Sequence, residues 1–553
     1  MDDFFMRIGY RNAVDFVIKF VAPILFISLL FFFFVLFFFE LPIFVPYFIL
    51  FIGVAFIFIY PFITMELIRT NIQENIHLFI TYAGTISTID LDRTTFFRKI
   101  STKHQYGHIS KTAEKILYLA KSWNLGFAKT CRKIARVTPS QIYSDFLDRL
   151  AATMDFGGDL ETFLSEEQDA VLNDYETEYK GSLNNIGMLR EVFIAITISV
   201  AFGMSVALLL PLLEGISILV AVRWSLLGML FIDVLLVILI KAFVPSDRLC
   251  HNLPKKDDLT RKIYKWFYII TPIVLVIAGV LFLFFNLSFI IVAAIAVTPY
   301  LYVGHLASKE EKEVIRKDKV FPSFVRALGT TIYARQGGIT SSLAALRVHD
   351  FGPLDSVVTN LYRRLKLGSD REKSWYYFAV ESGSNMINYF AHIFAESVYL
   401  GGHAQKIGEL ISKNFSRLVN LRSLRHQQAA SLRGALYGSL LGFIATIYIS
   451  VSITNMLATI FVDSFVESAT EGAIGGLIGS VVPTIPEVDM TLVNLYIGIM
   501  VFIHAFVSSL IIKMVDGGQK FAFFFDFTMM LWLGAILSYF VPLVSSSLFS
   551  PVT

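Results

Sequence analysis

Residues 390–402 read FAHIFAESVYLGG, and residues 146–158 read FLDRLAATMDFGG. The two stretches lie 244 residues apart and share their first Phe, a central Ala and a closing pair of glycines, Gly157-Gly158 and Gly401-Gly402. Upstream, Gly84 matches Gly329 at an offset of 245. A spacing this constant over about 80 residues indicates an internal duplication, because chance matches do not keep one register. We therefore predict two homologous modules.

The composition is too apolar for a chain that is surrounded only by water. The chain has 553 residues, of which 55% are hydrophobic and 16% charged, and 53 are Phe. Soluble domains carry about 25% charged residues, so the apolar surplus points to lipid. The net charge of +3 is too small to indicate a nucleic-acid partner. We expect a multi-pass protein of the cell membrane.

Apolar runs of about 20 residues, the length that crosses a bilayer as a helix, predict about nine spans. They form a hairpin over 20–63, four helices over 192–305 and a C-terminal region over 434–553. The polar modules between them cover 64–191 and 306–433. Because Lys and Arg gather beside the modules and are absent from the outer turns, we expect both modules and the N-terminus in the cytoplasm, and the C-terminus outside.

Two segments flank this arrangement. Residues 1–19 alternate charged and apolar side chains at helical spacing, which predicts an amphipathic helix in the membrane interface or a solvated lead-in. Residues 462–491 contain five acids and no Lys or Arg, so we expect an external loop. Its Gly-rich centre, 472–479, is apolar but too short to span, and it favours a re-entrant or interfacial helix.

The modules show helix signals and no alternating strand pattern, which predicts an all-α fold. Thr138-Pro139 has the pattern of a helix start, because Thr accepts a backbone hydrogen bond and Pro suits the first helical position. Gly157-Gly158 is expected to end that helix. Asp159 is expected to cap a long helix that runs on into the membrane.

No motif for chemistry stands out. The chain has no nucleotide-binding Gly-Lys-Ser/Thr loop, no metalloprotease helix and no nucleophile elbow. His104 and His108 lie four residues apart without a third ligand beside them, which favours a solvated pair. Cys131 and Cys250 fall in cytoplasmic segments and are expected to be reduced thiols. We predict no catalytic residue, metal or cofactor.

Two polar residues inside the predicted spans need a reason, because charge in lipid is costly. Asp233 lies in the middle of the span 217–244, and His504 lies in the span 492–512. An ion pathway would show several such groups on facing helices, so structural pairing is favoured over transport.

Charge segregates strongly within the first module. Residues 93–136 hold eleven basic side chains and one acid, whereas 145–178 hold eleven acids and one base. Such runs are usually solvated faces; the alternative is a docking surface for a complementary partner. The candidate partner-binding residues are Arg132, Lys133, Arg136, Arg363, Arg364, Lys366, Arg371 and Lys373.

At the repeated positions the chain resembles the type II secretion F-domain family, the inner-membrane platforms of type II secretion and type IV pilus machines. The resemblance rests on Phe79 and Gly84-Thr85, on Phe324 and Gly329-Thr330, and on the two Gly-Gly pairs. It implies that each module is an antiparallel bundle of about six helices. The bacterial members usually have three spans, fewer than this chain.

The larger layout resembles the membrane platform proteins of the archaellum, the archaeal flagellum. That resemblance implies a cytoplasmic hexameric motor ATPase as partner, archaellin or pilin subunits assembled into a filament, and no enzymatic activity of the chain itself. The alternative is the platform of an archaeal type IV adhesive pilus or a type II secretion-like system. A rival from another class is an ion or solute transporter.

The layout also suggests a mechanism. Helices continuous over 159–213 and 404–461 would carry motion from the cytoplasm into the membrane. We expect a homodimer, because two-fold pairs are the commonest closed assembly.

Overall fold

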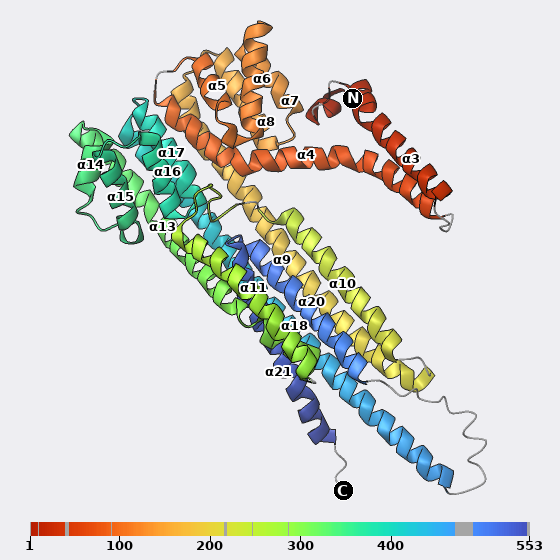
Figure 1. The fold of residues 1–553 in the computed structure, drawn as a ribbon. Helices are drawn as coiled ribbons and strands as arrows, with labels where there is room; N and C mark the ends of the chain where they lie inside the picture. Colours follow the sequence, from red (N-terminus) through yellow and green to blue (C-terminus); the bar gives the residue numbers. More distant parts are fainter. Residues whose placement is uncertain are drawn as a thin grey trace. The chain divides into compact units, whose positions relative to one another are not determined.

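The computed structural model describes residues 2–8, 10, 12–38, 44–89, 91–214, 218–245, 247–285, 287–470 and 490–549. Within these residues the regular secondary structure is helical, apart from one isolated bridge between Cys250 and Ser384 (Figure 1). The all-α prediction is therefore confirmed. The helices form two compact units: unit 1 is Met1–Tyr179, Val320–Tyr376 and Ile387–Arg417, and unit 2 is Lys180–Lys319, Tyr377–Met386 and Leu418–Thr553.

The duplication is visible in the helix order. The first set is α4 (Phe44–Ser87), α5 (Arg93–Ser101), α6 (His108–Ser122), α7 (Phe127–Val137), α8 (Gln141–Asp155) and α9 (Leu160–Glu214). The second set is α13 (Tyr300–Arg335), α14 (Ile339–Leu346), α15 (Asp355–Lys366), α16 (Arg371–Ser382), α17 (Asn385–Tyr399) and α18 (Ala404–Thr470). The last three helices of the two sets begin 244 residues apart, so each module is built from six helices in the same order.

The repeated Gly-Gly pairs end α8 and α17 in the same way. The Gly158 N–H donates to the Thr153 carbonyl at 2.9 Å, and the Gly402 N–H donates to the Ser397 carbonyl at 3.0 Å. The first glycine of each pair has a φ of +71° or +92°, which a residue with a side chain rarely adopts. These hydrogen bonds satisfy carbonyls left open at the helix ends and confirm the predicted caps.

The predicted helix start at Thr138-Pro139 is wrong. Thr138 closes α7 instead: its N–H donates to the Ala135 carbonyl at 3.1 Å, and its hydroxyl donates to the Ile134 carbonyl at 2.8 Å. The N-cap of α8 is Ser140, which has an extended backbone and a fully buried side chain. The Thr138 hydroxyl donates to a carbonyl four residues earlier in the chain instead of accepting from an N–H of the next helix, and sequence spacing does not distinguish the two.

Both long helices are confirmed as continuous. Asp159 accepts a hydrogen bond from the Thr162 N–H at 2.8 Å and so caps α9, which runs for 55 residues. Helix α18 runs for 67 residues. Each of these helices contributes its first part to unit 1 and the rest to unit 2.

The repeated Gly84 and Gly329 mark close approaches between the first and last helices of each module. A Cβ at Gly329 would lie 2.5 Å from the Ala404 carbonyl oxygen and 3.1 Å from the Cα of Gly408, so α13 and α18 touch backbone to backbone. A Cβ at Gly84 would meet the side chain of Gln168 on α9. Position 329 therefore has room only for glycine.

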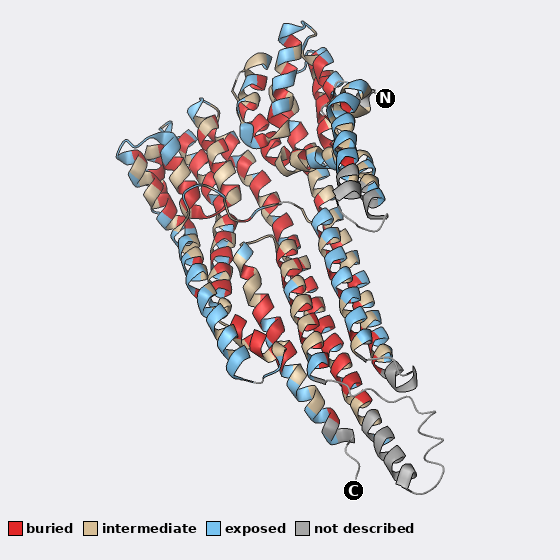
Figure 2. Cartoon of the chain, turned by 45° about the vertical axis from the view of Figure 1, so that its right-hand side comes forward, coloured by how far each residue is buried: buried red, intermediate tan, exposed pale blue. Residues whose placement is uncertain are grey.

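Buried residues line one side of the helices in each module (Figure 2), and many of the largest of them are aromatic. In the first module Phe79 packs edge-on against Phe146, with ring centroids 5.4 Å apart. In the second, Phe415 packs against both Phe321 and Phe390, at 4.7 and 5.1 Å. All of these rings are at most 3% exposed, so each module has its own apolar core.

Unit 2 contains the apolar helices α10 (Ile218–Phe243), α11 (Asp258–Phe284), α12 (Phe289–Val297), α20 (Met490–Asp516) and α21 (Phe523–Phe549). Helix α20 packs against α10, α12 and α21. Among the described residues, eight helices are long and apolar enough to cross a membrane, or nine if α12 and α13, bent by 49° at Thr298-Pro299, form one span. This count agrees with the prediction of about nine.

The N-terminal stretch differs from the prediction. It is not one amphipathic helix over 1–19 but α1 (Asp2–Arg7) and α2 (Ala13–Phe16), followed by a π-helical turn (Val17–Val21) and the apolar α3 (Ala22–Phe38). The Asn12 side chain accepts a hydrogen bond from the Asp15 N–H at 2.9 Å and starts α2 afresh. The predicted Gly-rich element at 472–479 lies outside the described residues.

Candidate functional site

In unit 1, α9 and α18 run side by side in the same direction, joined by ion pairs. Lys406 pairs with Glu161 at 3.2 Å, Lys413 with Asp169 at 2.8 Å, and Arg417 with Glu176 at 2.6 Å. The partners are 241 to 245 residues apart, close to the repeat offset, so equivalent positions of the two modules face each other. We call this contact the module seam.

The seam explains where the acidic run of the first module is used. Three carboxylates of α9 pair with basic side chains of α18, so part of this acidic run is neutralised by the second module. Lys413 and Asp169 are 60% and 49% exposed, so their pairing adds little stability. Arg417 is 21% exposed and also donates to Asp169 at 3.1 Å, which makes it the main anchor of the seam.

Beneath these ion pairs the seam contains buried polar side chains. The amide of Asn414 donates to the Thr81 hydroxyl and to the Gln168 carbonyl oxygen, both at 2.9 Å, and all three side chains are buried. Ser397 donates to the Thr85 hydroxyl at 2.9 Å. Buried polar groups need such partners, so these bonds hold the two modules in a defined register.

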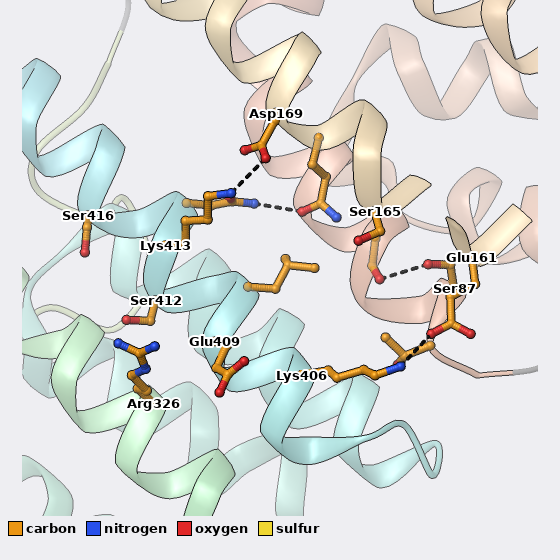
Figure 3. A pocket seen from close by; sticks show the side chains of 15 residues that line it. Ser87, Glu161, Ser165, Asp169, Arg326, Lys406, Glu409, Ser412, Lys413 and Ser416 are labelled. Atoms are coloured by element: carbon orange, nitrogen blue, oxygen red, sulfur yellow. Dashed lines mark hydrogen bonds and ion pairs between the residues drawn. The ribbon is translucent and has the colours of Figure 1, made fainter. Parts of the chain in front are cut away.

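An open cleft of about 700 Å³ lies along the seam (Figure 3). The figure shows Lys413 directed at Asp169 and Lys406 directed at Glu161 across the cleft. Its charged lining is Arg326, Lys406, Lys413, Glu161, Asp169 and Glu409. Three positive and three negative groups balance, so the lining favours neither an anion nor a cation.

The predicted docking residues occupy helices that are equivalent or adjacent in the two modules. Arg132, Lys133 and Arg136 lie on α7, while Arg371 and Lys373 lie on its counterpart α16. Arg363, Arg364 and Lys366 end the neighbouring helix α15. Apart from the half-buried Arg364, these side chains are exposed, and Arg132 is paired with Asp155 at 2.6 Å. The eight therefore fall into two groups, one on each module.

The two polar residues of the predicted spans are partners of each other. The Nδ1 of His504 on α20 lies 2.9 Å from a carboxylate oxygen of Asp233 on α10, and neither side chain is more than 1% exposed. The rings of Phe193 and Phe443 pack beside the imidazole, with centroids 5.8 and 5.7 Å away. The contact joins two apolar helices through one buried hydrogen bond.

Unit 2 also holds a buried charge network that the sequence did not reveal. Arg422 on α18 donates two hydrogen bonds of 2.6 Å to Asp247 and one of 2.8 Å to Asp318 on α13. Its side chain is 8% exposed. A fork-to-carboxylate geometry of this kind fixes both direction and register.

One helical turn later, Arg425 binds backbone carbonyls. Its guanidinium donates to Val515 at 2.6 Å and to Met514 at 3.1 Å, at the C-terminal end of α20. It also donates to Pro245 at 2.9 Å and Asp247 at 3.1 Å, after α10. A cation here satisfies carbonyls that the helix leaves open and suits the negative end of its dipole.

A third group completes this network at the turn between α20 and α21. Lys513 is paired with Glu311 on α13 and with Asp516, and Asp516 lies 2.6 Å from Nδ1 of His426 on α18. Glu311 also accepts a hydrogen bond from the backbone N–H of Gln519. Helix α18 is thus tied to α13, to the segment after α10 and to the α20–α21 turn.

Candidate metal and thiol chemistry is limited in the described part of the chain. No group of three His, Cys, Asp or Glu side chains there is placed to hold a metal ion. Cys131 and Cys250 are free. Burial raises the pKa of the Cys131 thiol to about 12, so this thiol is neutral in the folded protein.

Comparison with known proteins shows which family the chain belongs to. Residues 79–208 match the family model of the type II secretion system (T2SS), protein F. The chain is 32% identical to flagella accessory protein J of Methanocaldococcus jannaschii over 499 residues, covering 88% of this chain and 87% of that protein. It is 30% identical to flagella accessory protein J of Methanococcus voltae over 510 residues, covering 88% of each. No solved structure matches the chain significantly. The chain therefore belongs to the flagella accessory protein J family, as a multi-pass membrane platform protein that carries the type II secretion protein F module.

Proposed function

We propose that the chain docks a cytoplasmic hexameric motor ATPase and transmits its motion to archaellin subunits during assembly and rotation of the archaellum. The observation that carries this proposal is the pairing of the two modules through equivalent positions of α9 and α18. Each module ends in one of these two helices, which also supply apolar spans. A displacement of the modules therefore has two stiff routes toward the membrane.

The buried charge network supports the same role. Helix α18 cannot slide along its axis without breaking the bonds from Arg422 to two carboxylates and from Arg425 to four carbonyls. Breaking a buried charge pair costs about 3–5 kcal/mol, so movement of α18 would carry its neighbours with it. Unit 2 would respond as a body rather than as separate helices.

The orientation completes the proposal. We place the modules, residues 64–191 and 306–433, in the cytoplasm, together with the N-terminus, and the C-terminus outside, because Lys and Arg gather on the module side of the spans. We propose a homodimer, since a two-fold pair fits an evenly divided ring of subunits. The basic residues of α7, α15 and α16 are the candidate contacts for the ATPase. The energy would come from that partner.

Two other functions fit less well. A platform for an adhesive pilus would use the same architecture, but the curated relatives at 30–32% identity are named for flagella. A transporter would require several polar groups converging at mid-membrane, whereas Asp233 and His504 are used on each other. The archaellum is therefore the assembly to test first.

The test is to interrupt one connecting helix beyond Tyr179, where the chain leaves unit 1. Four glycines inserted after Gly187 in α9 would let the two parts of the helix move independently. We expect cells carrying this variant to lose filaments and swimming, while the purified chain still binds the ATPase.

The matched control inserts the same four glycines after Pro254, in the irregular segment before α11. This insertion should leave swimming intact. Normal filaments from the Gly187 insertion would refute transmission through α9. A wild-type chain that fails to bind the motor ATPase would refute the docking role as well.

A further inference from the structure

Exposed apolar side chains lie at the same turn of both modules. Trp123 follows α6 and Leu367 follows α15, 244 residues later, and they are 62% and 84% exposed. In both cases the next residue, Asn124 or Gly368, has a positive φ of 52° or 74°. Each copy of the duplicated turn therefore exposes an apolar side chain directly before a residue with a positive φ.

A second equivalent pair lies before the Gly-Gly caps. Phe156 follows α8 and is 89% exposed, and Leu400, again 244 residues later, is 39% exposed. Consecutive helices of an antiparallel bundle alternate in direction, so the turns after α6 and α8 lie at one end of the first module. The same holds for the turns after α15 and α17. We call these ends the module tips.

The two tips face the same way. Helices α9 and α18 both start at a tip, and the Glu161–Lys406 pair joins them close to their first residues. Unit 1 thus presents two equivalent tips at one end. In α9, about 30 helical residues, roughly 45 Å of helix, lie between this end and the apolar stretch.

Basic side chains lie on the helix turns that flank the apolar ones. The first tip carries Lys121, Lys129, Arg132 and Lys133. Its acids are used within the protein: Asp155 is paired with Arg132 at 2.6 Å, Glu161 with Lys406 at 3.2 Å, and Asp159 caps α9. The second carries Arg363, Lys366, Arg371 and Lys373, with Asp370 and Glu372.

Two of these second-tip groups already have a structural role. Asp370 accepts a hydrogen bond from the Lys373 N–H at 2.8 Å and so caps α16. Arg371 lies 4.8 Å from the ring centroid of Tyr399, which holds its charge at the tip. Exposed apolar side chains flanked by lysines and arginines, with most of the nearby acids engaged within the chain, match a pocket lined with apolar groups and edged with carboxylates.

We propose that the two module tips are equivalent docking sites for two identical subunits of an oligomeric soluble partner, each subunit offering an apolar pocket edged with carboxylates. This rests on the proposed function, in which that partner is the hexameric motor ATPase. Repeated sites on one chain gain affinity only when the partner repeats its own surface, as a ring of identical subunits does. One chain would then hold two subunits of the ring together.

The contact is tested with the full-length chain in detergent and the purified motor ATPase. The photo-crosslinking residue p-benzoylphenylalanine replaces Trp123, Leu367 or Val348, one at a time. Val348 is the matched control, because it is 90% exposed but lies in the turn between α14 and α15, at the other end of the second module. We expect crosslinks from 123 and 367 to the same segment of the ATPase, and none from 348.

Affinities provide the second measurement. Trp123→Ser and Leu367→Ser should each weaken ATPase binding about 10- to 30-fold, and the double variant should remove it, whereas Val348→Ser should bind normally. Crosslinks to lipid, to a second copy of the chain, or to different ATPase segments from the two tips would overturn the proposal. If the wild-type chain binds the ATPase but no tip variant weakens binding, the tips fail and the platform role stands. If the wild-type chain does not bind, both fail.

Discussion

Lys413 and Asp169 occupy equivalent positions of the two modules, 244 residues apart, and they are paired with each other at 2.8 Å. A residue that contacts its own counterpart lies on or near the axis that relates two copies, as in a two-fold dimer interface. The duplication therefore gave the chain an internal dimer. The two copies differ in charge at this contact: α9 is acidic and α18 is basic. In a dimer of identical chains, like charges would face each other at these positions.

The seam should depend more on Arg417 than on Lys413. Arg417→Ala is expected to lower the stability of the module pair by about 1–2 kcal/mol, because the side chain is half-buried and binds two carboxylates. Lys413→Ala should cost about 0–1 kcal/mol, because both partners are exposed. Thermal unfolding in detergent measures the difference, and equal effects would contradict the assigned anchor.

Arg422→Ala should be one of the most damaging single changes in unit 2. Removing the guanidinium leaves Asp247 and Asp318 without their shared cation, at a cost of about 3–5 kcal/mol. The triple variant Arg422→Met, Asp247→Asn, Asp318→Asn should recover part of the loss, because none of the three positions then carries an unpaired charge. Gln427→Ala, at an exposed position of the same helix, is the control. The readout is the thermal midpoint of the purified chain, and a triple variant no better than the single one would count against the network.

The Asp233–His504 pair should show strong coupling. His504→Leu leaves a buried carboxyl without its partner, and Asp233→Leu leaves a buried imidazole, so each single change should destabilise by about 1–3 kcal/mol. The double leucine variant should be more stable than the sum of the two, since two apolar residues suit a buried position between apolar helices. A double-mutant cycle on thermal stability measures this, and additive effects would mean that the contact contributes nothing of its own.

The equivalent glycines should not tolerate alanine equally. Gly329→Ala places a Cβ 2.5 Å from a carbonyl oxygen and should cost about 1–3 kcal/mol, because backbone must move. Gly84→Ala meets the movable side chain of Gln168 and should cost less, chiefly through the Gln168–Asn414 hydrogen bond. Gly434→Ala, in α18 with open space around it, should be neutral or slightly stabilising. Resistance to limited proteolysis ranks the stability of the three variants.

Cys131 should report unfolding of the first module. Its pKa is raised to about 12 by burial, so at pH 8 the thiol is almost entirely protonated as well as inaccessible. A thiol reagent should label it slowly in the folded chain and rapidly in denaturant, where the pKa returns to about 8.5. A Cys250→Ser background isolates the signal. Rapid labelling of the folded chain would show that α7 opens readily.

The local pattern of residues was enough to predict most of the helices. Runs of apolar residues set the spans, Asp159 and the two Gly-Gly pairs set helix ends, and the constant offset of 244 residues revealed the duplication. These features act within a few residues of chain, or repeat at fixed spacing, so a sequence displays them directly. The start of α8 was mispredicted because two helix ends compete within three residues, at Thr138 and Ser140.

Which charges meet was decided by the tertiary structure. The acidic run of α9 was visible in the sequence, but not that it faces α18. A structural pairing was expected for Asp233 and His504, but the sequence did not show that these two residues, 271 positions apart, pair with each other. Arg422 and Arg425 looked like ordinary basic residues of a helix before its span, until packing placed carboxylates and open carbonyls beside them. A side chain's partner depends on how distant helices pack, and helical periodicity gives the face of a residue without giving the neighbour of that face.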